Sequence, residues 1–431
     1  MPKSVSMPVG TLRRARYLVP GIVLATLVAS GAAVAATAPI ADAATTPGSI
    51  DTTFGTAGWM SIAESSLPGL GSAGAVDVLA NGDILLAGTG GLARLLPSGK
   101  VDTSFGSDGV AAAPFRESTV AIQPNGEIIY AGTASSPDGG TEWGVAKFTA
   151  NGALDPTFGT GGVVTTEILN PAPTTITFET PTAALVQPDG KLLVLGTVEN
   201  FGGYRGQGSF FEQAVVRYGT NGALDAGFGT GGEAQSATFA GSGELGLDAT
   251  GDIFIAPGTG WTSKEAELSP SGQVDAAVTA AAITASSSSV LMPSGQFAVA
   301  STVAQGRSES HVQVTRYNPG STVASTSALL AWASTVGKDA GTAAGTLAGG
   351  QALILGEHNN SSSVLASVNP DGTLDSTFGS GGISKITPPS ADAGGYFAAS
   401  ALVLPSGKIL VSGLASASNG SPLIILSQFI A

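Results

Sequence analysis

The sequence predicts an all-β protein, a seven-bladed β-propeller of four-stranded antiparallel blades. A hairpin pattern that recurs seven times is the first observation behind this prediction. The second is a motif built on Asp, Phe and Gly that alternates with the hairpins. The third is that one repeat is divided between the two ends of the chain. Self-similarity at a fixed period is typical of propellers and other repeat folds.

Each predicted hairpin has an apolar strand, a tight turn and a second apolar strand that ends in a small residue. Turns such as Pro124-Asn125-Gly126 supply the positive φ that a short hairpin needs. The second strands are Ile84–Gly88, Ile128–Gly132, Leu192–Gly196, Ile253–Pro257, Phe297–Ser301, Ala352–Gly356 and Ile409–Gly413. Apolar runs without alternation indicate sheets that are covered on both faces. Because no helix pattern lies between the strands, we expect small sheets packed face to face around an axis.

The second motif has the form Leu-Asp-x-Thr-Phe-Gly followed closely by a Gly-Gly pair. Its copies are Leu154–Gly162, Leu224–Gly232 and Leu374–Gly382, with looser copies at Val101–Gly106 and Ile50–Gly55 and an eroded one at Val274–Val278. We expect each Asp to accept backbone N–H bonds within the following turn, and each Phe to fill space between blades. A calcium site is disfavoured, because calcium loops need several closely spaced oxygen ligands.

The spacing of the repeats sets the number of blades. Residues 45–431 divide into seven units of about 55 residues, which suits four strands per unit, although six or eight blades stay open as alternatives. The chain ends at Leu426–Ala431, at the stage of the repeat that directly precedes the Asp motif. The first copy of that motif follows Pro47. We therefore expect N- and C-terminal strands to close the last blade together.

The two motifs resemble the delta-60 repeat of exported bacterial proteins. The most similar segments are Leu154–Gly162, Leu224–Gly232, Leu374–Gly382 and Gln187–Gly196. The resemblance extends over essentially all of residues 45–431 and is weakest in the fourth and fifth units. It implies a β-propeller without an assigned biochemical function, and it carries no catalytic residues over to this chain.

The N-terminus has the three parts of a secretory signal peptide. Arg13 and Arg14 belong to a basic start, Tyr17–Ala36 is an apolar stretch, and Ala41-Asp42-Ala43 is a small-residue cleavage motif. We expect a signal peptide over residues 1–44, a single propeller domain over 45–431 and a secreted, extracellular product. In the alternative, the apolar stretch stays uncleaved and holds the protein at the membrane. No second apolar span follows, so no membrane span is expected after cleavage.

Composition excludes several classes of function. The net charge of −14 disfavours nucleic acid as a partner, because phosphates would be repelled. Cysteine is absent and only two histidines occur, so thiolate chemistry is excluded and a histidine-rich metal site is disfavoured. Gly69–Gly74 matches G-x-G-x-x-G but does not lie between a strand and a helix. We expect no cofactor, no metal site and no catalytic residue.

The connection after each second hairpin strand varies most between the repeats. In a propeller these connections emerge on one face, and aromatic residues in them are typical of a binding surface. The candidate ligand-binding residues are Trp143, Phe201, Tyr204, Arg205, Phe210, Phe211 and Trp261. Glu309 and His311 occupy the fifth connection, and Glu357 and His358 the sixth. In the alternative, these connections only cover blade edges.

Two functions remain open at this stage. The first is a non-catalytic exported module that binds a neutral glycan, a surface polymer or a protein partner. The alternative is a propeller enzyme, a lyase or glycoside hydrolase, that acts on extracellular polysaccharide. A cluster of carboxylates with histidine or tyrosine near the ring axis would favour the enzyme. The sequence does not indicate an oligomeric state.

Overall fold

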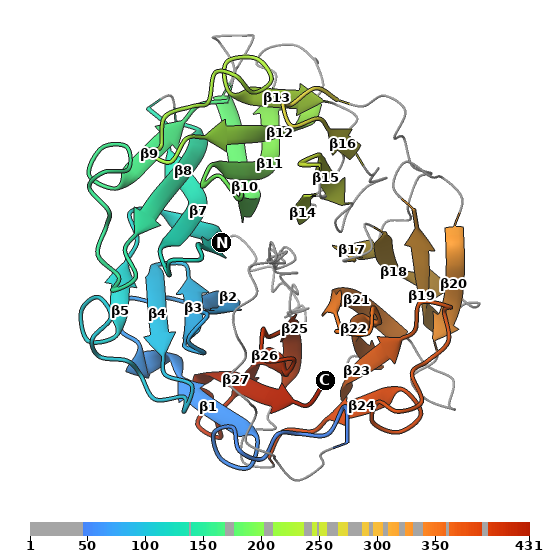
Figure 1. The fold of residues 1–431 in the computed structure, drawn as a ribbon. Coiled ribbons are helices and arrows are strands. Elements are labelled where there is room, and N and C mark those ends of the chain that lie inside the picture. The colour runs from blue at the N-terminus through green and yellow to red at the C-terminus, as the bar shows by residue number, and fades with distance from the viewer. Residues whose placement is uncertain are drawn as a thin grey trace, which may run out of the picture.

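A computed structural model gives the fold of this chain. It describes residues 46–431 except 138, 169–175, 202–209, 237–243, 248–249, 257–265, 275–286, 293–295, 305–308, 319–323, 331–338, 359–361 and 390–394. Seven antiparallel sheets stand around a common axis (Figure 1). The prediction of a seven-bladed β-propeller is therefore confirmed.

We number the blades 1 to 7 along the chain and call the strands of each blade A to D from the axis outward. Blade 1 comprises β2 (Ala73–Val78), β3 (Ile84–Gly88), β4 (Gly91–Leu95) and β5 (Val110–Ala112), preceded by a short 3-10 turn, η1 (Glu64–Ser66). Blade 2 comprises β6 (Arg116–Ile122), β7 (Ile128–Ser135), β8 (Thr141–Phe148) and β9 (Val163–Thr166). Blade 3 comprises β10 (Ile176–Val186), β11 (Leu192–Phe201), β12 (Phe210–Tyr218) and β13 (Glu233–Ser236).

The remaining blades follow the same order. Blade 4 comprises, among the described residues, β14 (Glu244–Leu247), β15 (Ile253–Ala256) and β16 (Ala266–Leu268). Blade 5 comprises β17 (Ser287–Leu291), β18 (Phe297–Ala304), β19 (Ser310–Tyr317) and β20 (Ala324–Leu330). Blade 6 comprises β21 (Asp339–Thr346), β22 (Ala352–His358), β23 (Ser362–Val368) and β24 (Ile383–Ile386). Blade 7 comprises β25 (Phe397–Val403), β26 (Ile409–Ser416), β27 (Pro422–Phe429) and β1 (Trp59–Ala63).

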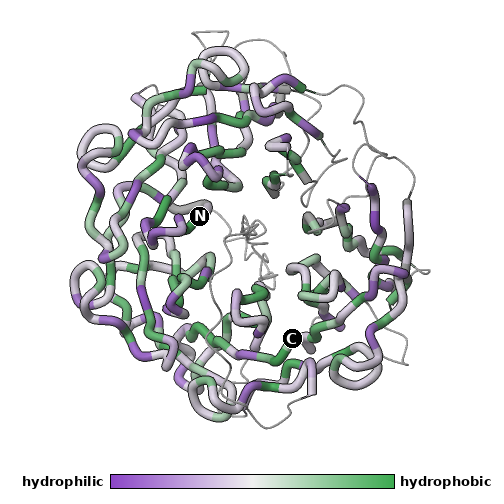
Figure 2. Tube along the Cα trace, in the orientation of Figure 1, coloured by the Kyte–Doolittle hydropathy of each residue, from purple (hydrophilic) through white to green (hydrophobic). Residues whose placement is uncertain are grey.

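The core lies between the blades rather than at the axis. Strand β3 is buried at every position, as expected for a sheet covered on both faces. One apolar cluster joins Val145 of blade 2 to Val194 of blade 3, and comparable clusters join other neighbouring blades. Hydrophobic residues accordingly recur along the strands of every blade instead of gathering on one side of the ring (Figure 2).

The two ends of the chain share blade 7, as predicted. The last strand, β27, lies between β26 and β1, and it pairs with β1 from Trp59–Ser427 to Ala63–Leu423. Ile50 forms a further bridge to Phe429, and the Gly48 N–H donates to the Ile430 carbonyl at 2.7 Å. The ring is therefore closed by pairing of N- and C-terminal strands within one sheet.

The repeated Asp has the structural role that the sequence predicts. The Asp155 Oδ1 atom accepts hydrogen bonds from the Thr157 N–H at 3.0 Å and the Thr157 hydroxyl at 2.7 Å. The same pair of bonds recurs at Asp51, Asp102 and Asp375, while Asp225 accepts the Gly227 N–H. These bonds favour the carboxylate, and those from Thr157 are the main reason that the pKa of Asp155 is lowered.

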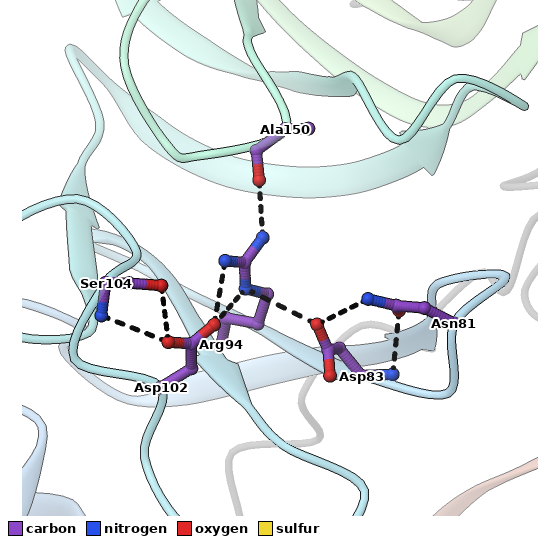
Figure 3. Close-up of polar contacts among 6 residues, drawn as sticks. All are labelled: Asn81, Asp83, Arg94, Asp102, Ser104 and Ala150. Carbon is purple, nitrogen blue, oxygen red and sulfur yellow. Dashed lines mark hydrogen bonds and ion pairs between the residues drawn. The ribbon is translucent and has the colours of Figure 1, made fainter.

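The second Asp oxygen pairs with a cation from strand C in blades 1 to 3. In blade 1, the Arg94 guanidinium lies 2.7 Å from Asp102 and 3.7 Å from Asp83, and it donates to the Ala150 carbonyl of blade 2 (Figure 3). In blade 3, Arg217 likewise joins Asp225 at 2.8 Å to the Pro270 carbonyl of blade 4 at 2.5 Å. These arginines therefore link blade 1 to blade 2 and blade 3 to blade 4.

A backbone hydrogen bond also closes the seam between neighbouring blades. The Gly of the Phe-Gly pair donates its N–H to a turn carbonyl of the next blade, as from Gly106 to Asn151 at 2.9 Å. The equivalent bonds run from Gly159 to Asn221, from Gly229 to Ser271 and from Gly379 to Pro47. Seams 1–2, 2–3, 3–4 and 6–7 are thus closed in one way.

Two non-glycine residues adopt the left-handed backbone conformation at a position where other repeats have glycine. Ala57 and Asp108 both have φ of 53°, where Gly161 has 62°. Replacing the exposed Ala57 with Gly is expected to raise the free energy of unfolding by about 0.5–1 kcal/mol, because it relieves left-handed strain. Gly161→Ala is the matched reverse change, since a Cβ there would touch nothing within 4 Å. Urea unfolding checks both; a lower midpoint for Ala57→Gly would contradict the prediction.

Candidate functional site

The two faces of the ring are built from different connections. Antiparallel order places the A–B turns and the C–D connections, which carry the Asp motif in blades 1, 2, 3, 6 and 7, on one face. The B–C and D–A connections open onto the opposite face, which we call the variable face. The sequence predicts the candidate binding residues on this variable face.

Trp143 is a core residue and not part of an exposed connection, which corrects our expectation for this side chain. Strand β8 already begins at Thr141, so Trp143 pairs with Thr133 and Thr166 inside blade 2. Its side chain is fully buried and packs so closely on Gly196 of blade 3 that a Cβ there would clash with the indole ring. The ring of Trp143 therefore contributes to the seam between blades 2 and 3.

The other predicted residues lie at or beyond the limits of what the structure describes. Phe201 ends β11, and Phe210 and Phe211 begin β12, with backbone pairing of Phe210 to Asn200 and of Phe211 to Glu199. This hairpin rises toward the variable face. Tyr204, Arg205 and Trp261 lie outside the described residues.

The two histidines of the chain meet at one buried carboxylate. The His358 Nδ1 atom lies 2.6 Å from Asp339 Oδ1, and the His311 Nδ1 atom lies 3.4 Å from Asp339 Oδ2. The Asp339 side chain is only 3% exposed, while those of His358 and His311 are 15% and 18% exposed. His311 belongs to β19 of blade 5, and Asp339 and His358 belong to β21 and β22 of blade 6.

Further polar groups extend this cluster. The Glu309 Oε1 atom lies 3.3 Å from His311 Nε2, and the Ser310 hydroxyl donates to the Asp339 carbonyl at 2.9 Å. Burial raises the pKa of Glu357, which precedes His358 on β22. The variable face therefore carries a chain of alternating carboxylates and imidazoles where blades 5 and 6 meet. We call Glu309, His311, Asp339 and His358 the histidine cluster.

The histidine cluster places carboxylates directly against imidazole rings. A carboxylate next to an imidazole fixes the tautomer and orientation of the ring. Across the described ranges, no set of three or more His, Asp or Glu side chains has a geometry that could hold a metal ion. The sequence pattern indicates Glu309, His311 and His358 but not Asp339, because no sequence spacing pairs residues across two blades.

A second buried carboxyl lies at the seam between blades 2 and 3. Glu179 on β10 is fully buried, and the Ile168 N–H donates to its Oε1 and Oε2 atoms at 3.1 and 3.2 Å. The Thr141 hydroxyl of blade 2 bonds to the backbone of Glu179. Burial raises the pKa of Glu179 to about 8, and the nearby Glu167, Glu233 and Glu142 contribute.

This shift gives stability a defined pH dependence. The folded-state pKa of about 8 exceeds the ordinary 4.5, so the folded protein holds the proton more tightly. The stabilisation is present below about pH 4.5 and is lost as pH rises to about 8. Each pKa unit corresponds to about 1.36 kcal/mol of unfolding free energy. Because Gln stays neutral, the Glu179→Gln variant is expected to lose on the order of 4 kcal/mol less unfolding free energy than the parent as the pH rises. Urea unfolding at pH 5 and pH 9 tests this; equal losses in parent and variant would contradict it.

Exposed apolar side chains lie at the variable-face ends of innermost strands. Phe178, near the start of β10, is 41% exposed, and Phe397, the first residue of β25, is 49% exposed. Phe397 pairs with Leu414, which is 38% exposed. Exposed aromatic side chains near the axis add contact area to the variable face.

This architecture defines the chain as a β-propeller built from repeats. Residues 79–105, 123–158 and 187–228 match a family model described as a domain of unknown function (DUF5122) beta-propeller. The match supports a β-propeller repeat family. No curated protein matches the chain.

Several solved structures match this chain over most of its length. The polysaccharide lyase Uly1 shares 13% identity over 83% of this chain and 89% of its own, with a TM-score of 0.46. A soluble aldose sugar dehydrogenase from Escherichia coli shares 12% identity over 85% and 99%, with a TM-score of 0.39. The gluconolactonase XC5397 from Xanthomonas campestris shares 11% over 81% and 83%, with a TM-score of 0.35. These likenesses concern the fold alone.

Within the described part of the chain, no helical segment combines the length and the hydrophobicity that crossing a bilayer requires.

Proposed function

We propose that the protein is an exported, non-catalytic propeller that binds a neutral glycan or a protein partner on its variable face. The observation that carries the proposal is the exposure of Phe178, Phe397 and Leu414 on this face. Aromatic rings bury much area at a small entropic cost, and a sugar ring or an apolar side chain can stack on them. Because the net charge is −14, an anionic polymer is a poor partner.

The long connection of blade 3 belongs to the same proposed surface. Phe201, Phe210 and Phe211 flank it, and Tyr204 and Arg205 lie within it. Trp261 of the next blade completes the proposed set, whereas Trp143 supports the surface from within the core.

The test is a glycan array and a pull-down with residues 45–431. Replacing Tyr204, Phe210 and Phe211 together with Ser, or Phe178 alone with Ser, is expected to weaken binding at least tenfold. Leu154→Ser is the control, because Leu154 is 36% exposed in the Asp motif of the opposite face. Binding that survives the variable-face changes, or that falls only with Leu154→Ser, would refute the proposal.

Export is part of the same proposal and rests on the N-terminal sequence. Expression of the full chain with a C-terminal tag is expected to release a product that starts near residue 45 into the medium. A product that keeps residues 1–44 and sediments with membranes would instead support the anchored alternative.

The histidine cluster favours a second candidate, a propeller enzyme that acts on extracellular polysaccharide. Its carboxylates and imidazoles are groups that general acid–base catalysis uses. The test is release of reducing or unsaturated ends from a panel of neutral polysaccharides, with Asp339→Asn and His358→Gln as variants. Turnover that both variants lose would favour the enzyme over the binding module.

A further inference from the structure

The seam between blades 7 and 1 lacks the backbone bond that closes seams 1–2, 2–3, 3–4 and 6–7. The backbone bond expected from Gly55 to Ser98 is not made, although both residues are described. At seams 1–2 and 2–3, a turn glycine of the next blade packs on the repeated Phe, as Gly152 does on Phe105. At seam 7–1 the equivalent glycine, Gly99, packs on Met60 instead.

The cross-blade arginine of seams 1–2 and 3–4 is missing as well, as it is at seams 2–3 and 6–7, where Lys147 and Ser367 take its position. Strand β27 carries Gln428 at the position that corresponds to Arg94 and Arg217, as shown by its carbonyl accepting the Asp51 N–H. The cation beside Asp51 comes instead from Lys408, in the A–B turn just before β26, at 2.7 Å. Lys408 therefore meets the repeated Asp within blade 7 and does not reach across the seam as the arginines do.

A cavity of about 320 Å³ occupies the space at this seam. It opens on the face opposite the variable face, between the A–B turns of blades 7 and 1. Its walls are mostly apolar and include Phe54, Leu79, Ile84, Pro97, Leu404 and Leu410. This volume lies within the range of small-molecule sites, near its lower end.

The polar lining of the cavity restricts what can bind. Lys408 is the one charged side chain that lines it, and its ammonium group is already neutralised by the Asp51 carboxylate. Ser406 and Gln428 add a hydroxyl and an amide group. An ionic ligand would lose its hydration without a free counter-charge, and a polyol would leave hydroxyl groups against apolar walls.

We propose that this seam cavity binds a small neutral amphiphile, an apolar ring or short chain that carries one hydroxyl or carbonyl group. The apolar part replaces the missing contacts between blades 7 and 1, and the polar group bonds to Ser406 or Gln428. Because ligand binding stabilises the folded state, occupancy raises the melting temperature of the ring. The seam cavity is separate from the variable face, so this proposal does not depend on the proposed function.

The test uses residues 45–431 with three small probes: phenol as the neutral amphiphile, benzoate as the anion and methyl α-glucoside as the polyol. Saturation-transfer NMR and thermal melting report binding. Phenol is expected to bind at millimolar concentration and to raise the melting temperature, and the other two probes are expected to bind at least tenfold more weakly.

Two variants locate the binding. Ala80→Trp and Ser406→Trp place an indole at the cavity from exposed turn positions of blades 1 and 7, and each is expected to weaken phenol binding at least tenfold. Pro188→Trp, at the exposed equivalent turn of blade 3, is the control and should leave binding unchanged. The proposal would be overturned if phenol did not bind, or if benzoate or the glucoside bound more tightly than phenol. It would also be overturned if the two cavity variants bound phenol as well as the Pro188→Trp control does.

Discussion

Deletion of residues 422–431 is expected to abolish the cooperative unfolding of the whole ring. The deleted segment includes β27, which lies between β26 and β1 and contributes Leu426, fully buried, and Phe429, 2% exposed, to the core. Its loss leaves unpaired edges on β26 and β1 and separates β1 from the rest of the sheet that lies between blades 6 and 1. The deletion therefore breaks more contacts between distant parts of the chain than any single substitution can.

Circular dichroism melting and urea unfolding measure this effect. The deletion is expected to give a broad transition with a reduced urea m-value, because less surface is buried in the folded state. Deletion of Ala431 alone is the control, since it leaves β27 and the Gly48–Ile430 bond in place. A cooperative transition at the parent temperature after the larger deletion would refute ring closure by the two ends.

The second large effect is expected at the repeated Phe. Phe158→Ala should lower the free energy of unfolding by about 3–5 kcal/mol, as truncation of large core side chains does. Phe158 is 1% exposed and belongs to a cluster of blades 2 and 3, and a Cβ on Gly222 of blade 3 would lie 3.2 Å from its ring. The truncation therefore opens a cavity at a seam that rigid strands cannot refill.

Urea unfolding of Phe158→Ala gives the magnitude. Phe178→Ala is the matched control, because Phe178 is 41% exposed and its truncation should change stability by less than about 0.5 kcal/mol. Equal effects of the two substitutions would contradict a core role for the repeated motif.

The fold could be predicted from the sequence because the same strand and turn patterns recur in several repeats. The hairpins, the Asp-capped turns and the divided last blade are all local or terminal patterns. The carboxylate bonds at Asp155 and the pairing of Ile50 with Phe429 follow directly from these patterns.

The candidate sites could be predicted less well, because they form between blades. Asp339 meets His311 from another blade, and neither residue belongs to a repeated motif. The sequence pattern places Trp143 in a connection, whereas the structure places it in strand β8. The start of β8 is set by its pairing with β7, and no single residue in the sequence indicates where that pairing begins. The seam cavity lies where blades 7 and 1 lack the backbone bond that four other seams have, so it emerges only when the seams are compared.

Closure through a shared sheet has a consequence for how the chain can be rearranged. The Gly48 N–H lies 2.7 Å from the Ile430 carbonyl, so the described chain begins and ends at neighbouring points of one blade. A short linker between these points, with new termini cut into an exposed turn such as Asp189–Gly190, would keep every strand pairing intact. Such circular permutants should fold to the same ring, and the blade that holds both new ends would then be the one that closes last.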